Sequence, residues 1–361
     1  MQQDVKLTRE VSPYIKKSWT STRVMIDVLI ALLPVVVFAI YKFGHYSLIR
    51  MIVGIAAAIL TEALIFPMSQ RADRRAEGFW KKFISRYKNF NSLNIFSAAV
   101  TGLILTLQLP SQISYYVLIV GSVVSIAIGK MVFGGTGNNI FNPAAVGRVF
   151  VALTFASFFS YQGVDVIAGA TPLGALDNMG IAAVTERYYI VDLLMGNIPG
   201  AMGEVSALAI IIGGIYLSVR KVADWKIMVG IVVPFAIFIL IAGFAIAPGH
   251  AFEFMLYHVL SGGLLFGVVF MATDPVTSPL HVTSKLLFGL LIAGLVVLIR
   301  VFSTMMPEGV VFSILFANMI TPLLDRIRIF RNRFNWQFAV TYGVSFVALV
   351  LIAYFGAGGT F

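Results

Sequence analysis

The stretch VMIDVLIALLPVVVFAIYKF, residues 24–43, decides the class of fold. It carries only two charges, Asp27 and Lys42, and it has the roughly 20 residues that an α-helix needs to cross the hydrocarbon core of a bilayer. Similar apolar stretches follow along the chain. We therefore predict an all-α polytopic membrane protein with eleven candidate spans, at about 24–43, 51–67, 92–110, 112–130, 142–160, 206–219, 227–247, 253–272, 285–303, 309–324 and 337–356.

The composition excludes a soluble protein and several kinds of site. Of the 361 residues, 59% are hydrophobic and only 12% are charged, against about a quarter charged in soluble domains. The absence of cysteine from the sequence excludes disulfides, thiolate metal sites, iron–sulfur ligation and cysteine nucleophiles. The four histidines lack the spacing of metal ligands, so we expect no metal site. Any redox chemistry must therefore use a borrowed cofactor.

The basic residues predict the orientation in the membrane. The net charge is +10, but Lys and Arg cluster between the apolar stretches, which indicates a lipid bilayer and not nucleic acid as the partner. If residues 1–23 are a cytoplasmic segment without a cleavable signal peptide, 22 of the 26 Lys and Arg residues fall on the cytoplasmic side. This asymmetry follows the positive-inside rule. It places the longest loop, residues 161–205, outside the cytoplasm.

An internal similarity favours two repeats. SAAVTGLILTLQLP (97–110) resembles SGGLLFGVVFMATDP (261–275), and the two cross the membrane in opposite directions in this orientation. Asn142 opens the fifth span, and Asn318 with Pro322 interrupts the tenth. These features predict a five-plus-five inverted repeat, which puts binding sites where helices are broken; chance similarity between apolar segments is the alternative. The predicted units are an N-terminal segment at 1–23, a first repeat at 24–160, the outer loop at 161–205, a second repeat at 206–325, and a basic loop with an extra span at 326–361.

The segment GGTGNNIFNPAAVGR, residues 134–148, is too polar and too rich in glycine for an ordinary span. Its glycines permit close approach of the backbone, and its asparagines offer amide donors and acceptors. Pro143 starts a helix whose free N–H groups suit an anionic or carbonyl-bearing ligand. A tight turn that satisfies its own backbone is the alternative. The candidate binding residues are Gly134, Gly135, Thr136, Gly137, Asn138 and Asn142.

The segment MATDPVTSPL, residues 271–280, is the second polar candidate. It places one carboxylate among three hydroxyls, a set of oxygens that can hold a hard cation or hydrogen-bond a polar ring edge such as that of a flavin. The alternative is an Asx or ST turn that only ends a helix. The candidate binding residues are Thr273, Asp274 and Thr277.

The third candidate is DVIAGATPLGAL, residues 165–176, in the outer loop. Its small neighbours Gly169 and Ala170 leave the hydroxyl of Thr171 accessible, and the proline that follows keeps this residue from continuing a helix. Asp165 lies six residues before Thr171. From the residues alone, the segment is a turn with an exposed hydroxyl.

Two acids lie inside predicted spans, Asp27 in the first and Glu62 in the second. Acids within the membrane are candidates for the handling of ions or protons. Both also lie close to Arg- and Lys-rich cytoplasmic flanks, so ion pairing at the membrane interface is the alternative.

Taken together, the motifs resemble a known family over about residues 10–330. They are SPYIKKSWTSTRVMIDVLIALLP (12–34), the turn at 134–148, DVIAGATPL (165–173), MATDPVTSP (271–279) and PEGVVFSILFANMITPLLD (307–325). Their order and spacing resemble the family formed by the D subunits of Rnf electron-transport complexes and, more distantly, the B subunits of sodium-pumping NADH:quinone oxidoreductases. The short polar segment before the first span favours the Rnf type.

The resemblance implies cofactors that composition cannot show. In that family, the threonine that ends the Gly-Ala-Thr motif carries FMN through a phosphoester bond, attached outside the cytoplasm by a flavin transferase; here it is Thr171. The family often has Ser or Thr where this chain has Ala168, while Asp165, Gly169 and Ala170 fit. A second, non-covalent flavin, riboflavin, is implied nearer the cytoplasm, and we expect it at 134–142 and 273–278.

The resemblance also implies the setting and the activity. The chain would lie in a prokaryotic cell membrane with Rnf subunits A, B, C, E and G, which would carry the ferredoxin and NAD⁺ sites. The complex would oxidise ferredoxin and reduce NAD⁺ while exporting Na⁺ or H⁺. Such proteins resemble urea channels in fold and have ten spans, so residues 337–356 would be an addition. The alternatives are the B subunit of the quinone reductase, a small-solute channel or transporter, and an inert assembly scaffold.

Overall fold

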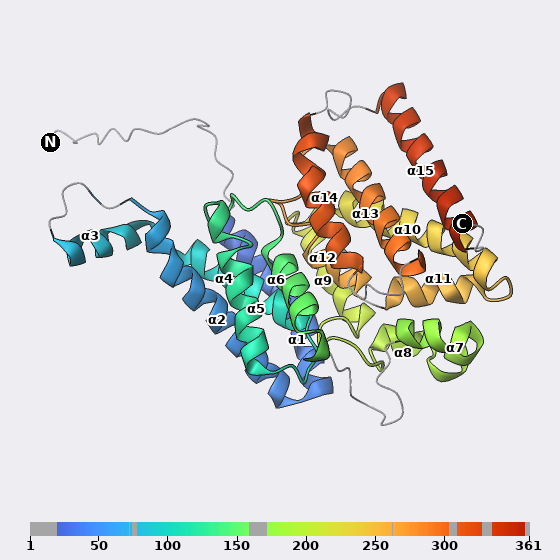
Figure 1. Ribbon diagram of the computed structural model, residues 1–361, viewed down its shortest axis with the longest axis horizontal. Helices are drawn as coiled ribbons and strands as arrows, with labels where there is room; N and C mark the ends of the chain where they lie inside the picture. The colour runs from blue at the N-terminus through green and yellow to red at the C-terminus, as the bar shows by residue number, and fades with distance from the viewer. Residues whose placement is uncertain are drawn as a thin grey trace, which may run out of the picture.

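The computed structural model describes residues 20–71, 73, 78–158, 172–261, 263–302, 309–326 and 334–357. Every regular element in these ranges is a helix (Figure 1). Seven of them are long and apolar enough to cross a membrane, or up to nine if each of two bent pairs counts as one span. The described part of the chain therefore has the predicted all-α polytopic membrane fold.

The helices follow the predicted spans closely. They are α1 (Ser21–Phe43), α2 (His45–Ser69), α3 (Phe79–Ser85), η1 (Arg86–Asn89), α4 (Ser92–Leu107), α5 (Tyr115–Ala127), η2 (Met131–Phe133), α6 (Pro143–Thr154), η3 (Ala156–Phe158), α7 (Pro172–Arg187), α8 (Ile190–Met195), α9 (Ala207–Val219), α10 (Trp225–Ile246), α11 (Ala251–Leu260), α12 (Leu264–Phe270), α13 (Val282–Phe302), α14 (Gly309–Arg326) and α15 (Trp336–Ala357).

Not every one of the eleven candidate spans is a complete, straight crossing. α6 and α9 have 12 and 13 residues, fewer than the roughly 20 that a complete crossing needs. The predicted span 253–272 is broken between α11 and α12, which are bent by 47°. Gly263 lies at this break with φ +70°, a backbone conformation that favours glycine. α4 is likewise bent by 73° from the helical turns of residues 79–89.

The order of helix types recurs in the two halves of the chain. The first half consists of α1, α2, the bent pair that ends in α4, α5 and α6. The second half consists, in the same order, of α9, α10, the bent pair that ends in α12, α13 and α14. Figure 1 shows α2, α4, α5 and α6 on one side of the molecule and α10, α11, α13 and α14 on the other. The similar segments 97–110 and 261–275 correspond to α4 and α12. Their C-terminal ends meet, because Gln108 Nε2 donates to Met271 Sδ at 2.7 Å. This arrangement agrees with an inverted repeat, whose exact boundaries stay a prediction.

The predicted interruption of the tenth span is wrong. α14 runs without a break through Pro322. A proline is tolerated inside a membrane helix when neighbouring groups satisfy the backbone that it disturbs. Asn318 does have a special role, because its Oδ1 accepts the backbone N–H of Asn142 at 3.2 Å. The two asparagines that the sequence singled out therefore join the two halves directly.

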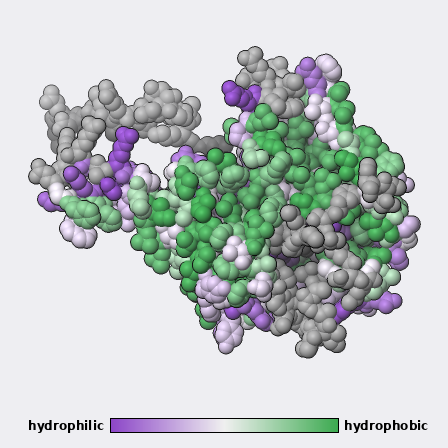
Figure 2. All heavy atoms as spheres, viewed as in Figure 1, coloured by the Kyte–Doolittle hydropathy of each residue, from purple (hydrophilic) through white to green (hydrophobic). Residues whose placement is uncertain are grey.

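The surface of the helices suits lipid. Figure 2 shows apolar residues over most of the visible face, with hydrophilic residues at its edges. Val37 and Leu64, for example, are 63% and 71% exposed, as expected where hydrocarbon and not water is the solvent. The extra helix α15 lies against α10, with the rings of Phe346 and Phe238 5.0 Å apart. Only 11% of the residues in its most apolar 18-residue stretch are buried, so α15 is a peripheral addition to the bundle.

The contact between α10 and α13 provides a test of the packing. A Cβ atom added at Gly289 would lie 2.5 Å from the backbone carbonyl of Gly230, so Gly289→Ala must push the two helices apart. We expect it to destabilise the protein by about 1–3 kcal/mol, measured as a lower midpoint of thermal unfolding of the purified chain. Gly343→Ala in α15 is the control, because nothing lies within 4 Å of its added Cβ. Equal effects of the two substitutions would contradict the close contact.

Candidate functional site

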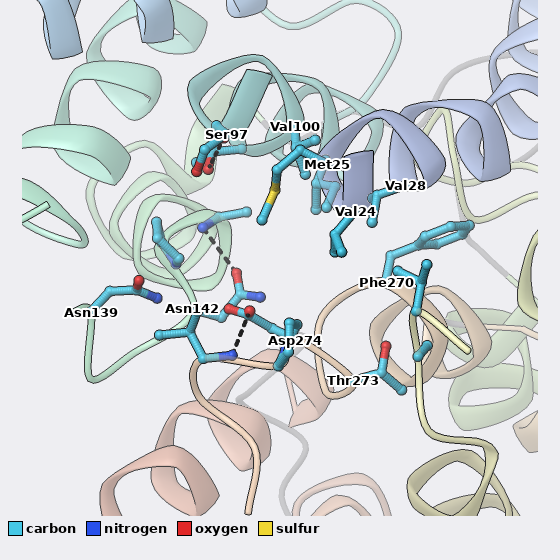
Figure 3. A pocket seen from close by; sticks show the side chains of 18 of the residues that line it. Val24, Met25, Val28, Ser97, Val100, Asn139, Asn142, Phe270, Thr273 and Asp274 are labelled. Atoms are coloured by element: carbon cyan, nitrogen blue, oxygen red, sulfur yellow. Dashed lines mark hydrogen bonds between the residues drawn. The ribbon is translucent and has the colours of Figure 1, made fainter. Parts of the chain in front are cut away.

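A polar pocket lies between the two halves of the chain, and we call it the turn pocket. It has a volume of about 740 Å³, counting the space open to solvent. Its apolar walls include Val24, Met25, Val28, Val100, Ile104 and Phe270, and its polar lining includes Ser97, Lys130, Thr136, Asn139, Asn142, Thr273 and Asp274 (Figure 3).

The structure brings the two predicted polar segments together in this pocket. Thr136, Gly137 and Asn142 line it from one segment, and Thr273 and Asp274 from the other. The remaining candidates shape the two turns without lining the pocket. They are Gly134 and Gly135, with φ +111° and +88°, Asn138, whose Nδ2 donates to the carbonyl of Gly134, and Thr277, whose hydroxyl donates to Asp274 Oδ2.

The start of α6 differs from the expectation of free N–H groups. The side-chain oxygen of Asn142 accepts the backbone N–H groups of Ala144 and Ala145 at 3.0 and 3.3 Å. Pro143 has no N–H, and Val146 donates its N–H to the backbone carbonyl of Asn142. The first turn is therefore satisfied by its own cap, and ligand recognition in the pocket falls to side chains.

The side chain of Glu62 has the densest polar contacts beside this pocket. Lys130 Nζ lies 2.5 Å from Glu62 Oε2 and donates to Ser97 Oγ at 2.9 Å. Asn94 Nδ2 and Thr136 Oγ1 donate to Glu62 Oε1 at 3.1 and 3.3 Å. The side chains of Glu62 and Lys130 are 0% and 2% exposed. This network joins α2, α4, the end of α5 and the glycine turn.

The sequence argument missed Lys130 as a site residue, because it counted this lysine only as a cytoplasmic flank. The available signal was a lysine placed directly before the glycine turn, at the end of an apolar stretch. A charge buried at such a place needs a partner of opposite sign, and the nearby acid is Glu62.

The other acids are also engaged. Asp27 pairs with Arg220 Nη2 at 3.3 Å and accepts a hydrogen bond from the hydroxyl of Tyr216 at 3.1 Å. Asp274, in the connection between α12 and α13, accepts the backbone N–H of Val276. Burial raises the pKa of Asp274 above its usual value, against the opposing effect of this and other hydrogen bonds and of the charge on Lys130. Both acids predicted inside spans are therefore ion-paired, and their role in ion handling stays a prediction.

A second pocket lies at the opposite ends of α10 and α13, and we call it the α7 pocket. Its volume is about 1,210 Å³, counting the space open to solvent. It is lined by Leu176, Gly180, Ile181, Ala182, Ile246, Ala247, Pro248, Gly249, His250, Phe254, His258, Arg300 and Val301. α7 lies beside α11 (Figure 1), and the hydroxyl of Tyr257 joins them by donating to the backbone carbonyl of Tyr188.

The candidates of the outer loop lie outside the described residues. They are Asp165, Gly169, Ala170 and Thr171. Thr171 directly precedes Pro172, the first residue of α7. The chain therefore leaves Thr171 into a helix that forms one wall of the α7 pocket.

The fold and the two pockets define a class: a multi-pass membrane protein with one polar pocket between its two halves and another at the far end of its helices. Comparison of the sequence with protein families is more specific. The chain belongs to the NQR2, RnfD, RnfE family, whose model matches residues 8–333.

Individual relatives are similar over most of the chain. The D subunit of the proton-translocating ferredoxin:NAD(+) oxidoreductase complex of Clostridium ljungdahlii is 34% identical, over 87% of this chain and 92% of its own length. The D subunit of the Na(+)-translocating ferredoxin:NAD(+) oxidoreductase complex of Acetobacterium woodii is 32% identical, over 90% and 94%. The B subunit of the Na(+)-translocating NADH-quinone reductase of Chromohalobacter salexigens is 38% identical, over 71% and 63%. The resemblance predicted from the motifs is confirmed.

The buried ion pair gives a test of the site. Lys130→Met leaves the carboxylate of Glu62 buried without its cation, and removal of one partner of such a pair costs about 3–5 kcal/mol. We expect a clear fall in the thermal unfolding midpoint, partly restored by adding Glu62→Gln. Lys226→Gln is the control: its ammonium lies 3.6 Å from Asp224 and is 35% exposed, so its loss should cost only about 0–1 kcal/mol. An unchanged midpoint for Lys130→Met would contradict the buried pair.

Proposed function

We propose that this chain is the flavin-carrying membrane subunit of an Rnf-type complex that moves electrons between ferredoxin and NAD⁺ and exports Na⁺ or H⁺. The main support is the extent of the similarity. The relatives named as D subunits are matched over 92% and 94% of their own length, whereas B subunits of the quinone reductase are matched over 63% in Chromohalobacter salexigens and 84% in Pseudomonas aeruginosa. This difference favours the D type over the B type.

The arrangement of the pockets is the structural support. The N-terminal ends of α10 and α13 lie at the same end of the molecule as the turn pocket. Residues at their C-terminal ends line the α7 pocket. α10 has 22 residues, or about 33 Å at 1.5 Å per residue, which is close to the thickness of the hydrocarbon core. Two cofactor sites at opposite membrane faces are what a protein that carries electrons across the bilayer requires.

The turn pocket fits a non-covalent flavin, which we take to be riboflavin. A bound flavin would supply reversible electron uptake and release. The apolar side chains of Val100 and Phe270 suit the faces of a flat ring, while Lys130 and Asn139 offer donors to its carbonyl edge. Asp274 lies at the same rim and can hold a proton there. Thr136 links this rim to Glu62.

The second proposed flavin is FMN, joined to Thr171 through a phosphoester bond. In the orientation predicted from the basic residues, Thr171 and the α7 pocket are extracytoplasmic and the turn pocket is cytoplasmic. A dedicated flavin transferase would then act outside the cytoplasm. Rnf subunits A, B, C, E and G would complete the complex and carry the sites for ferredoxin and NAD⁺.

Ion export requires an element with two states whose balance the electron transfer changes. Glu62 is our first candidate, because its ion pair with Lys130 borders the turn pocket. Asp27 is the second, and its partner Arg220 is 31% exposed. The choice of ion stays open, because relatives of 34% and 32% identity are named for protons and for Na(+) respectively.

The attachment of FMN is the direct test. The full chain is purified from cells that contain a flavin transferase and is run on a denaturing gel. We expect flavin fluorescence that remains with the band, because only a covalent link survives denaturation, and its loss in Thr171→Ala.

Thr185→Ala is the matched control, since this threonine lies in α7 and its hydroxyl donates only locally, to the carbonyl of Ala182. It should retain the fluorescence. An intact mass without the flavin adduct, despite active transferase, would favour a small-solute channel or transporter. Unchanged turnover of the whole complex with Thr171→Ala would favour an inert scaffold.

A further inference from the structure

A third pocket lies beside the N-terminal ends of α10 and α13, and we call it the basic pocket. Its polar lining consists of three lysines, one acid and two residues with hydroxyl groups: Lys221, Lys226, Lys285, Asp224, Ser218 and Ser278. Trp225, the first residue of α10, lies at the same place. The pocket is therefore rich in hydrogen-bond donors and in positive charge.

The single carboxylate in this lining is shared between two of the lysines. Lys285 Nζ lies 2.7 Å from Asp224 Oδ2, and Lys226 Nζ lies 3.6 Å from Asp224 Oδ1. One negative charge thus faces three ammonium groups, so the described lining has a surplus of positive charge. Ammonium groups and hydroxyls are donors that suit a phosphate group.

The backbone of Lys221 is unusual for a lysine. Its φ is +56°, and it is the one residue other than glycine with a positive φ in the described part of the chain. The N–H of Val222 donates to the carbonyl of Leu217 at 3.0 Å, which closes α9 in the pattern where glycine is usual at the position of Lys221. A side chain is strained in this conformation, and such residues cluster at binding and catalytic sites. The lysine at this position therefore indicates a use for its charge.

An apolar groove adjoins the basic pocket, and we call it the α15 groove. Its lining includes Phe334, Trp336, Phe338, Tyr342 and Gly343. Lys285 lines the basic pocket, and the next residue, Leu286, lines the groove. Trp225 and Trp336 are 55% and 74% exposed, and indole rings at the ends of spanning helices are typical of the membrane–water boundary. The pocket and the groove therefore lie where lipid headgroups meet acyl chains.

These features together select an amphipathic anion. The lysines suit a phosphate group, and the aromatic and apolar side chains of the groove suit a hydrocarbon chain. A free inorganic phosphate would leave the groove uncovered, and a lipid without net charge would leave the surplus of positive charge unmatched. Basic pockets between membrane helices are places where anionic phospholipids bind.

We propose that the basic pocket and the α15 groove together bind one anionic phospholipid, with its phosphate among Lys221, Lys226 and Lys285 and one acyl chain along α15. The bound lipid holds the peripheral helix α15 against α13. Its headgroup lies against Thr273 and Pro275, which line the turn pocket as well as the basic pocket.

The test measures lipid binding by the full chain, purified in a neutral detergent. Phosphatidylglycerol, phosphatidylcholine or inorganic phosphate is added at equal concentration. Bound lipid is counted by native mass spectrometry, and the thermal unfolding midpoint is recorded. We expect the chain to retain phosphatidylglycerol in preference to phosphatidylcholine, and we expect phosphatidylglycerol to raise the midpoint more than either of the other two additions.

Lys221→Gly removes the charge and relieves the strained backbone in one substitution. We expect the affinity for phosphatidylglycerol to fall about fivefold, the effect of one lysine at an anionic lipid surface. The midpoint without lipid should be unchanged or higher, because glycine favours this backbone conformation. The flavin content of the chain should not change, since Lys221 does not line the turn pocket. Lys81→Gln is the control: Lys81 is an exposed lysine of α3 that lines neither the basic pocket nor the groove.

Gly343→Leu tests the groove without changing any charge. Nothing lies within 4 Å of a Cβ added at Gly343, so the leucine fills part of the groove without pushing the helices apart. We expect weaker binding of phosphatidylglycerol with long acyl chains and unchanged binding of its short-chain form. Unchanged binding of both forms would show that no acyl chain lies along α15.

Three results would overturn the lipid site as a whole. They are equal retention of phosphatidylglycerol and phosphatidylcholine, an equal loss of affinity with Lys221→Gly and Lys81→Gln, and an equal rise of the midpoint with inorganic phosphate, which would indicate a site for free anions. Loss of the lipid when the chain assembles with its partner subunits would also contradict the proposal, because another subunit would then occupy the basic pocket.

Discussion

The ion pair between Glu62 and Lys130 is the constraint on which the arrangement of the turn pocket depends. Two opposite charges with almost no exposure persist only with close mutual contact and further hydrogen bonds, and Ser97, Asn94 and Thr136 supply these. The network fixes α2, α4 and α5 relative to the glycine turn. A buried pair of this kind contributes little to stability compared with apolar packing, so its presence indicates a need for charge at this place.

Much of the fold could be predicted from the sequence, because hydrophobic length and the placement of charge depend on the bilayer alone. The eleven apolar stretches all contain helices. The length of α6 and the break at Gly263 could not be predicted in this way, since they depend on how the two halves pack against each other. The predicted interruption at Pro322 was wrong for a related reason. A proline weakens a helix locally, but contacts with neighbouring elements determine whether the helix ends there.

The candidate site was predicted in part. The glycine turn and the Thr/Asp segment do meet, as expected from the resemblance, which implied one flavin at both segments; their polarity alone only marked each segment separately. Lys130 was missed because basic residues at the ends of spans are common at the cytoplasmic face of membrane proteins. Only the structure shows that this lysine is buried against Glu62. The α7 pocket was missed entirely. Its residues come from α7, α10, α11 and α13, and no short motif marks residues that converge from four separate helices.

The backbone contact between Gly230 and Gly289 has a consequence for how the protein can work. Helices in backbone contact have little freedom to slide or separate, so α10 and α13 form a rigid pair that extends between the two faces of the membrane. A rigid pair of helices keeps a constant distance between ligands bound at its two ends. A movement that admits an ion on one face and releases it on the other would then keep α10 and α13 together as one unit.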